Sequence, residues 1–159
     1  MAMLNDISTD LDDVPRFVHA PKLSGNRGRD LAFPVSTAGA VAAAYPDLAP
    51  LDLPCSPGDA YARARRVARG TPRWTITYED VEAFTFEGVA VTRLCRFRDD
   101  FVVRVRPGRE GGAVIDMRSK SRIGKSDLGT NAKRIRRFLS AVEQIGPSGE
   151  EESFPAPGE

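Results

Sequence analysis

One short segment of the chain concentrates the residue types that bind anions. Between Met117 and Gly129, four side chains are cationic and three carry a hydroxyl group. The cations are Arg118, Lys120, Arg122 and Lys125, and the hydroxyls belong to Ser119, Ser121 and Ser126. Because the segment leads into a helical pattern, the backbone N–H groups at the helix start, with Arg122 and Lys125 beside them, would form an anion site. The alternative is that Asp127 caps the helix and pairs with the cations merely to fix the loop.

The tripeptide Gly124-Lys125-Ser126 also resembles the end of a phosphate-binding P-loop. That motif needs a further glycine upstream, at the position that Ser119 occupies. It also belongs to a parallel sheet with crossover helices, whereas the short connections in this chain predict antiparallel hairpins. We therefore reject a nucleotide-binding P-loop.

The remaining reactive side chains give little support for catalysis or metal binding. His19 is the single histidine and lies in an irregular segment, so it offers no fixed base for a serine or cysteine. Asp99 and Asp100 are expected at a hairpin tip, and adjacent strand residues would face opposite sides of a sheet. Cys55 and Cys95 cannot complete a structural zinc site with one histidine; they either form a disulfide or remain two separate thiols. We predict no catalytic residue, no metal and no cofactor.

The charge of the chain is segregated along its length. Residues 1–60 hold 4 basic and 8 acidic side chains, residues 61–145 hold 19 and 10, and residues 146–159 hold 0 and 4, so the net charge is only +1. The basic middle could attract an anionic partner, or the acidic ends could fold back and screen it. No nucleic-acid partner is expected, because the exposed aromatic platform of a single-strand binder is missing from the pattern. No apolar run reaches the length of a membrane span.

Three helices are expected to position these residues. Residues 36–45 favour a short helix that ends before a proline. Ser56 is a preferred N-cap, and apolar residues at three- and four-residue spacing after it predict a helix over 57–70. The same spacing over 128–145 predicts a long amphipathic helix, opened by Asp127 or by the serine before it.

Strand patterns fill the space between the helices. The runs are 51–53, 74–78, 81–87, 89–97, 101–105 and 113–119. Short turns join the later ones, including an Arg98-Asp99-Asp100 turn, and such connections require antiparallel neighbours. We therefore predict an α+β fold: an antiparallel sheet of about six strands, with an N-terminal helix and a long C-terminal helix on one face. This order resembles the helix-grip arrangement of START-like domains, which often leaves an apolar cavity under the last helix.

The predicted organisation is one domain with two dissimilar ends. Residues 1–50 are expected to form an extended N-terminal strap over a formed domain, because residues 1–35 lack periodicity but carry isolated large apolar residues. Residues 51–145 hold the regular elements of a single α+β domain. Residues 146–159 combine glycine, proline and glutamate, a composition that predicts a disordered acidic tail.

Several segments resemble the domain of unknown function 1499 family. The most specific is IDMRSKSRIGKSDLGTNAKRIRRFLSAV, and NDISTDLDDVP, AAAYPDLAPL and RFRDDFVVRVRP also resemble it. The motif positions present are Arg118, Ser119, Arg122, Gly124, Ser126, Asp127, Gly129 and Asn131. The sequence departs from the family pattern at Lys120 and Cys95. The resemblance implies a bacterial, extracytoplasmic protein without established activity, often behind an N-terminal membrane anchor, and residues 1–3 are consistent with loss of such an anchor.

These observations lead to one main functional hypothesis and two rivals. The main hypothesis is a non-catalytic, envelope-associated (periplasmic) domain that binds a small amphipathic or anionic ligand. Its candidate ligand-binding residues are Arg118, Ser119, Arg122, Gly124, Lys125, Ser126, Asp127 and Asn131. The rivals are a hydrolase or transferase that uses Ser119, Ser126 and Asp127, and a protein-interaction module. The sequence leaves the oligomeric state open.

Overall fold

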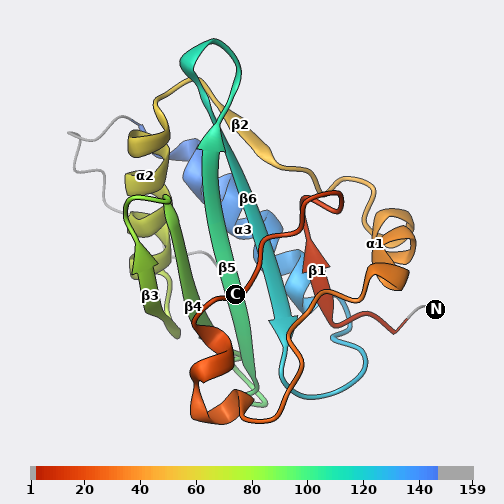
Figure 1. Ribbon diagram of the computed structural model, residues 1–159. Coiled ribbons are helices and arrows are strands. Elements are labelled where there is room, and N and C mark those ends of the chain that lie inside the picture. The colour runs from red at the N-terminus through yellow and green to blue at the C-terminus, as the bar shows by residue number, and fades with distance from the viewer. Residues whose placement is uncertain (1–2, 147–159) are drawn as a thin grey trace.

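An antiparallel sheet forms the centre of the molecule in the computed structural model, which describes residues 3–146 (Figure 1). The strand order is β1-β6-β5-β4-β3, and β2 also pairs with β6. The strands are β1 (Asp6–Ser8), β2 (Leu51–Leu53), β3 (Trp74–Asp80), β4 (Thr85–Val91), β5 (Arg98–Pro107) and β6 (Ala113–Ser121). The helices are α1 (Ala38–Ala44), α2 (Pro57–Gly70) and α3 (Thr130–Gln144). The predicted α+β class with an antiparallel sheet and a long C-terminal helix is confirmed.

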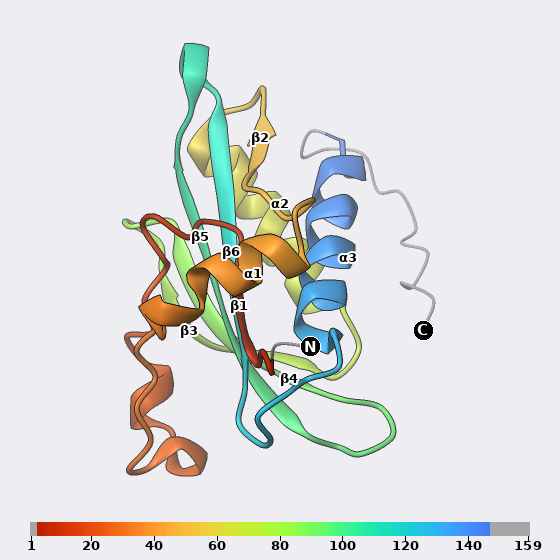
Figure 2. The same cartoon turned by 90° about the vertical axis from the view of Figure 1, so that its right-hand side faces the viewer.

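Two of the helices cover one face of the sheet, as Figure 2 shows from the side. The start of α2 is fixed by Ser56, whose Oγ accepts a hydrogen bond from the Asp59 amide at 3.2 Å. Along α3, the side chains of Ala132, Ile135, Phe138, Leu139 and Val142 are buried. Amphipathic helices of this length are stabilised mainly by burying such a stripe against a partner surface.

The sheet residues under these helices form an apolar core. Phe86 and Phe101 are fully buried there, and Trp74 packs between the rings of Phe101 and Phe138, with centroids 4.5 and 5.6 Å away. Gly88 makes this packing possible, because a Cβ atom at that position would lie 2.3 Å from Phe101 Cζ. Aromatic rings therefore fill the space between α3 and the sheet where a helix-grip cavity would lie.

The opposite face of the sheet is covered by an irregular segment, residues 9–37, which we call the strap. It contains the one-turn 3-10 helices Ala20–Lys22, Ser24–Asn26 and Val35–Thr37 and crosses the front of the sheet in Figure 1. Ahead of the strap, β1 pairs with the end of β6 and places Ile7 in the core. Residues without periodicity thus supply both an edge strand and a cover.

The strand boundaries differ from the prediction at two turns. Residues 81–84 form the β3–β4 turn instead of starting a strand, because Asp80 Oδ1 accepts the Ala83 amide at 3.0 Å. Residues 92–97 form the β4–β5 loop, closed by two hydrogen bonds between Thr92 and Phe97. One predicted strand is lost, and β1 brings the sheet back to six strands.

The predicted turn at Arg98, Asp99 and Asp100 is also wrong, because these residues begin β5. Both carboxylates are buried, where cationic partners from distant parts of the chain compensate their charge. The predicted disordered tail lies outside the described residues, apart from Gly146. Among residues 3–146, none of the helices is long and apolar enough to cross a bilayer.

Candidate functional site

The candidate ligand-binding residues divide between the two faces of the sheet. Successive residues of β6 point to opposite faces, so Arg118 lies under the strap while Ser119 lies under α3. Arg122 follows Arg118 to the strap side, and Asn131 joins Ser119. The structure therefore builds two separate polar clusters from a segment that the sequence suggested as one site.

Under the strap, Arg118 is almost completely buried, with 2% of its surface exposed. Its guanidinium makes a bidentate pair with Asp6 at 2.8 and 2.9 Å and donates to the carbonyls of Pro15 and Leu31. The rings of Phe17 and Phe33 lie 4.6 and 5.5 Å from it. These contacts anchor three stretches of the N-terminal segment to β6, so they give Arg118 a structural role.

A second carboxylate on the strap side holds Arg122. Asp100 accepts from Arg122 Nε and Nη2 at 2.9 and 2.8 Å and from Asn26 Nδ2 at 2.9 Å. The hydrogen bonds to Asp100 raise the pKa of Arg122, against the effect of burial. Glu87 completes this face by accepting the amides of Val18, His19 and Ala20. The strap is thus held by buried charges of the sheet.

Under α3, the second cluster connects the helix to the ends of β5 and β6. Ser119 Oγ donates to Asn131 Oδ1 at 2.6 Å, and Asn131 Nδ2 donates to Ser121 Oγ at 2.8 Å. Arg134 donates to Ser119 and Asn131 and pairs with Asp99 at 2.7 Å. Burial raises the pKa of Asp99, and the Arg134 guanidinium counters part of that rise. Asp99 Oδ2 has the Arg134 guanidinium as its ion-pair partner but accepts no hydrogen bond, whereas Ser119, Asn131 and Arg134 are hydrogen-bonded to one another. The cluster therefore fixes the orientation of α3.

Asp127 takes the structural role that the sequence offered as an alternative, but the N-cap of α3 is Gly129, and Asp127 acts from two residues ahead of it. Its carboxylate accepts the amides of Gly129 at 2.9 Å and Asn131 at 2.8 Å, and its carbonyl accepts the Thr130 amide. The expected contact between Asp127 and Arg118 or Arg122 is wrong, because Asp6 and Asp100, distant in sequence, take those arginines.

The other loop residues have separate surroundings. Gly124 has a φ of +86°, which favours glycine, and its carbonyl accepts from Asn5 Nδ2 at 2.7 Å. Lys125 is exposed, and Ser126 Oγ accepts the Leu128 amide at 3.4 Å. Within residues 3–146, no hydrogen bond joins Ser119, Ser126 and Asp127 into a nucleophile–base arrangement.

The possible disulfide is not formed, since Cys55 and Cys95 are both free thiols. Cys55 follows β2, which pairs with the first residues of β6, whereas Cys95 lies in the loop next to its last residues. The nine residues of β6 separate these ends by roughly 27 Å. A disulfide needs Cα atoms within about 7 Å, so the fold excludes it.

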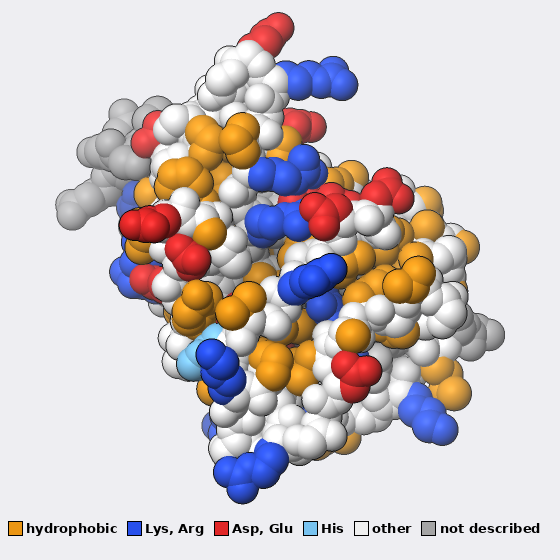
Figure 3. Space-filling view, in the orientation of Figure 1, with side chains coloured by type: hydrophobic (Ala, Val, Ile, Leu, Met, Phe, Trp, Pro, Cys, Tyr) orange, Lys and Arg blue, Asp and Glu red, His pale blue; other side chains and the backbone are white. Residues whose placement is uncertain are grey.

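The sequence analysis missed a hollow of about 620 Å³ that lies between two stretches of the strap, residues 11–21 and residues 29–35. Its apolar walls come from Leu11, Val14, Phe17, Pro21, Leu31, Ala32, Phe33, Val35 and Ala38. Its charged lining consists of Asp12, Asp13, Arg16, Arg29, Asp30 and Arg118. Figure 3 views this side of the molecule, where hydrophobic side chains lie exposed among charged ones. The isolated apolar residues of the strap were the available signal, but their convergence depends on the fold.

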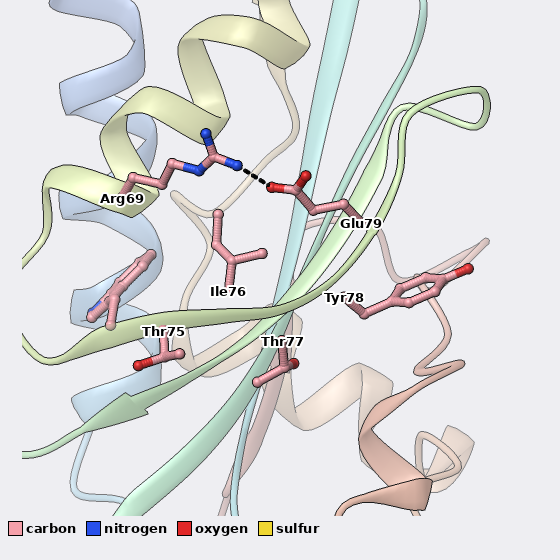
Figure 4. A pocket seen from close by; sticks show the side chains of 7 residues that line it. Arg69, Thr75, Ile76, Thr77, Tyr78 and Glu79 are labelled. Atoms are coloured by element: carbon pink, nitrogen blue, oxygen red, sulfur yellow. Dashed lines mark hydrogen bonds and ion pairs between the residues drawn. The ribbon is translucent and has the colours of Figure 1, made fainter.

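Another hollow, of about 560 Å³, lies against the free edge of the sheet. Its walls are the backbone and side chains of β3 from Trp74 to Glu79, with Arg69 of α2 above them (Figure 4). Arg69 pairs with Glu79 at 2.9 Å across it. This hollow has one strand for most of its wall, so it encloses a ligand less completely than the strap hollow does.

Comparison with known proteins identifies a family but no activity. The family model described as "Protein of unknown function (DUF1499)" matches residues 6–142, and no curated protein matches the chain. The crystal structure of Ara h 8.0201 aligns with a TM-score of 0.45 and 12% identity, over 59% of this chain and 91% of that one. A DUF4468 family protein from Bacteroides ovatus ATCC 8483 gives 0.30 and 10%, over 64% and 88%. Similarity at these TM-scores supports no conclusion about function.

Proposed function

The chain belongs to the DUF1499 family of proteins of unknown function, and we propose that it binds a small amphipathic ligand in the strap hollow without transforming it. The observation that carries the proposal is the hollow itself. Its volume of about 620 Å³ falls within the range of about 300–1,000 Å³ that is usual for small-molecule sites. Its lining combines aliphatic and aromatic walls with a few charged groups, as such sites commonly do.

The walls of the hollow are firmly held, which favours a preformed site. Phe17 and Phe33 lie against the guanidinium of Arg118, and that guanidinium is fixed by Asp6. Leu31 is buried beside them and its carbonyl is bonded to the same arginine. A ligand that binds against side chains already held in place loses less binding free energy to ordering the protein.

The charges of the lining indicate what kind of polar head would fit. Arg118 and Asp13 are paired with Asp6 and Arg104 outside the lining, which leaves two arginines against two aspartates. The hollow therefore carries no excess positive charge for a polyanion. Arg29 donates to Asn26 and to the Ser121 carbonyl, while Arg16 is exposed and has no ion pair among the described residues. We infer an amphiphile with one small anionic or zwitterionic head near Arg16.

Native mass spectrometry and lipid extraction of freshly purified protein test the proposal first. Titration with dodecanoate and with dodecanol then separates the contributions of head and chain. Ala32→Trp fills the hollow from an exposed position and should abolish binding of both, whereas Val81→Trp, on the β3–β4 turn, should leave both unchanged. Arg16→Ala should weaken dodecanoate binding alone. Equal binding by wild type and Ala32→Trp would refute the strap hollow as the site.

The separation of Ser119, Ser126 and Asp127 favours a binding domain over the rival hydrolase or transferase. Ser119 is fully buried under α3, and the Asp127 carboxylate already accepts two backbone amides. A nucleophile and its base must lie within hydrogen-bond reach of each other and of the substrate. The periplasmic location remains a prediction, which fractionation of the expressing cell would check.

A further inference from the structure

Exposed hydrophobic side chains gather at one end of the molecule. The β4–β5 loop exposes Leu94 and Phe97, with 89% and 45% of their surfaces accessible, and the β6–α3 loop exposes Ile123 and Leu128, with 60% and 84%. Met3, 65% exposed, precedes β1. We call the surface formed by residues 92–98, residues 122–129 and Met3 the loop end.

Hydrogen bonds hold the segments of the loop end beside one another. The Arg122 amide donates to the Arg98 carbonyl at 3.2 Å, which joins the bases of the two loops. The Asp127 amide donates to the Leu4 carbonyl at 3.0 Å, which brings Met3 against the second loop. Both loops emerge from the same end of the sheet in Figures 1 and 2. The exposed side chains therefore belong to one surface.

The backbone of the loop end is strained at two residues. Leu128 has a φ of +52° and Arg96 a φ of +56°, in the left-handed region where glycine or asparagine would be less strained. Leu128 is nevertheless a large apolar residue that points into solvent, and its side chain contributes little to the core. An exposed leucine in a strained conformation suggests a function outside the packing of the domain.

The charges around these apolar residues are predominantly positive. Arg96, Arg98 and Lys125 are exposed at the loop end. Asp127 is the single carboxylate in residues 92–98 and 122–129, and it is occupied in capping α3. Aliphatic and aromatic side chains flanked by arginine and lysine are typical of surfaces that enter the interface of an anionic bilayer.

We propose that the loop end docks on an anionic lipid surface, with Leu94, Phe97, Ile123 and Leu128 inserted among the headgroups. Charge complementarity selects this occupant, because Arg96 and Arg98 flank Phe97 in the sequence, and Lys125 lies between Ile123 and Leu128. A nucleic acid would use the cations but not the aliphatic side chains. Protein interfaces are usually depleted in lysine and need a continuous packed area, whereas two protruding loops suit shallow insertion. The proposal does not depend on the strap hollow being a ligand site.

Vesicle co-sedimentation of the full chain tests the proposal. The protein should bind vesicles of phosphatidylcholine with about one-third phosphatidylglycerol, bind pure phosphatidylcholine much more weakly, and be released by high salt. Arg96→Gln/Lys125→Gln should lower the partition coefficient about 25-fold, at about fivefold per cation removed. Leu128→Gly should lower it about tenfold while relieving the strained φ, so the variant is expected to fold.

Val81→Ser is the matched control, because Val81 is 58% exposed but lies on the β3–β4 turn, away from the loop end. It should bind vesicles as the wild type does. No binding to the anionic vesicles, or equal binding by wild type and Leu128→Gly, would overturn the proposal. Sedimentation velocity decides the remaining case: a wild-type dimer that Leu128→Gly converts to a monomer would assign the loop end to self-association instead.

Discussion

The two faces of the sheet are stabilised in opposite ways. On the helix face, α2 and α3 pack mostly apolar side chains on Phe86, Phe101 and Met117, with one polar cluster around Asp99 and Arg134 at the start of α3. On the strap face, several of the buried groups are charged, and Glu87, Asp100 and Arg118 bond to the strap. The first face depends on the hydrophobic effect, which needs apolar area but little directional precision. The second depends on the geometry of each pair, because a buried charge without its partner is strongly destabilising.

This contrast separates two roles within one domain. The helix face fixes the fold, while the strap face positions a segment that has no regular pattern of its own. The strap is held at a few discrete points, with unfilled space between residues 11–21 and residues 29–35, and the hollow lies there. Because a few ion pairs and hydrogen bonds hold the strap on the sheet, space between these contacts can stay unfilled. Close apolar packing would fill such space.

Removing a buried charge from the strap face should cause the largest loss of stability. Asp6→Asn leaves Arg118 and Lys120 without their shared carboxylate, so urea unfolding should show a loss of about 3–5 kcal/mol. Adding Arg118→Met should recover part of that loss, because the methionine can pack between Phe17 and Phe33. Asp12→Asn, at an exposed strap position, serves as the control and should be nearly neutral. A double variant no more stable than Asp6→Asn would contradict the importance of the unpaired charge.

On the helix face, Ile135→Ala should lower the free energy of unfolding by about 2–4 kcal/mol, because the Ile135 side chain of α3 is completely buried. Thermal or urea unfolding at low and high salt provides the comparison with Asp6→Asn. The loss from Ile135→Ala should not depend on salt, since no charge is involved. Arg137→Ala, on the exposed side of α3, should change the free energy of unfolding little. A marked salt dependence of the Ile135→Ala loss would mean that the faces are not independent.

Asp127→Ala isolates the helix cap and should cost about 1–2 kcal/mol. The two backbone amides that Asp127 accepts would lose their partner, but no arginine would be left unpaired, because Arg118 and Arg122 have their own carboxylates. Ser126→Ala should have a smaller effect, since its Oγ makes one hydrogen bond of 3.4 Å. Melting of Asp127→Ala at the wild-type temperature would show that the cap does not stabilise α3.

The smallest effect should be a pH dependence at Asp99. Burial raises the pKa of this carboxyl, so its ionised form costs stability above the folded-state pKa, and that cost disappears as the pH falls toward the unfolded-state pKa. The wild type should therefore gain stability relative to Asp99→Asn as the pH falls through this window. Unfolding of both proteins across a pH series measures it. A stability difference that stays constant with pH would contradict the raised pKa.

Local patterns in the sequence predicted the helices of the helix face well. Ser56 and the apolar spacing after it predict α2, and the stripe in residues 128–145 predicts α3, because both signals lie within a few residues of one another. Patterns failed where alternation continued into turns, as at residues 81–84 and 92–97, where side-chain hydrogen bonds end the strands. The buried positions of Asp99 and Asp100 could not be predicted, since their partners are Arg134, Arg122 and Asn26.

The sequence by itself determined the α+β class and the two covering helices, and it offered the structural role of Asp127 as one of two readings. Each depends on periodicity or on neighbours along the chain, which secondary structure converts directly into geometry. Only the tertiary structure decided that Arg118 and Ser119 serve different clusters, that the strap encloses a hollow, and that two distant loops form one basic, apolar end. These features arise from contacts between residues far apart in sequence, such as Asp6 and Arg118, which no local pattern records.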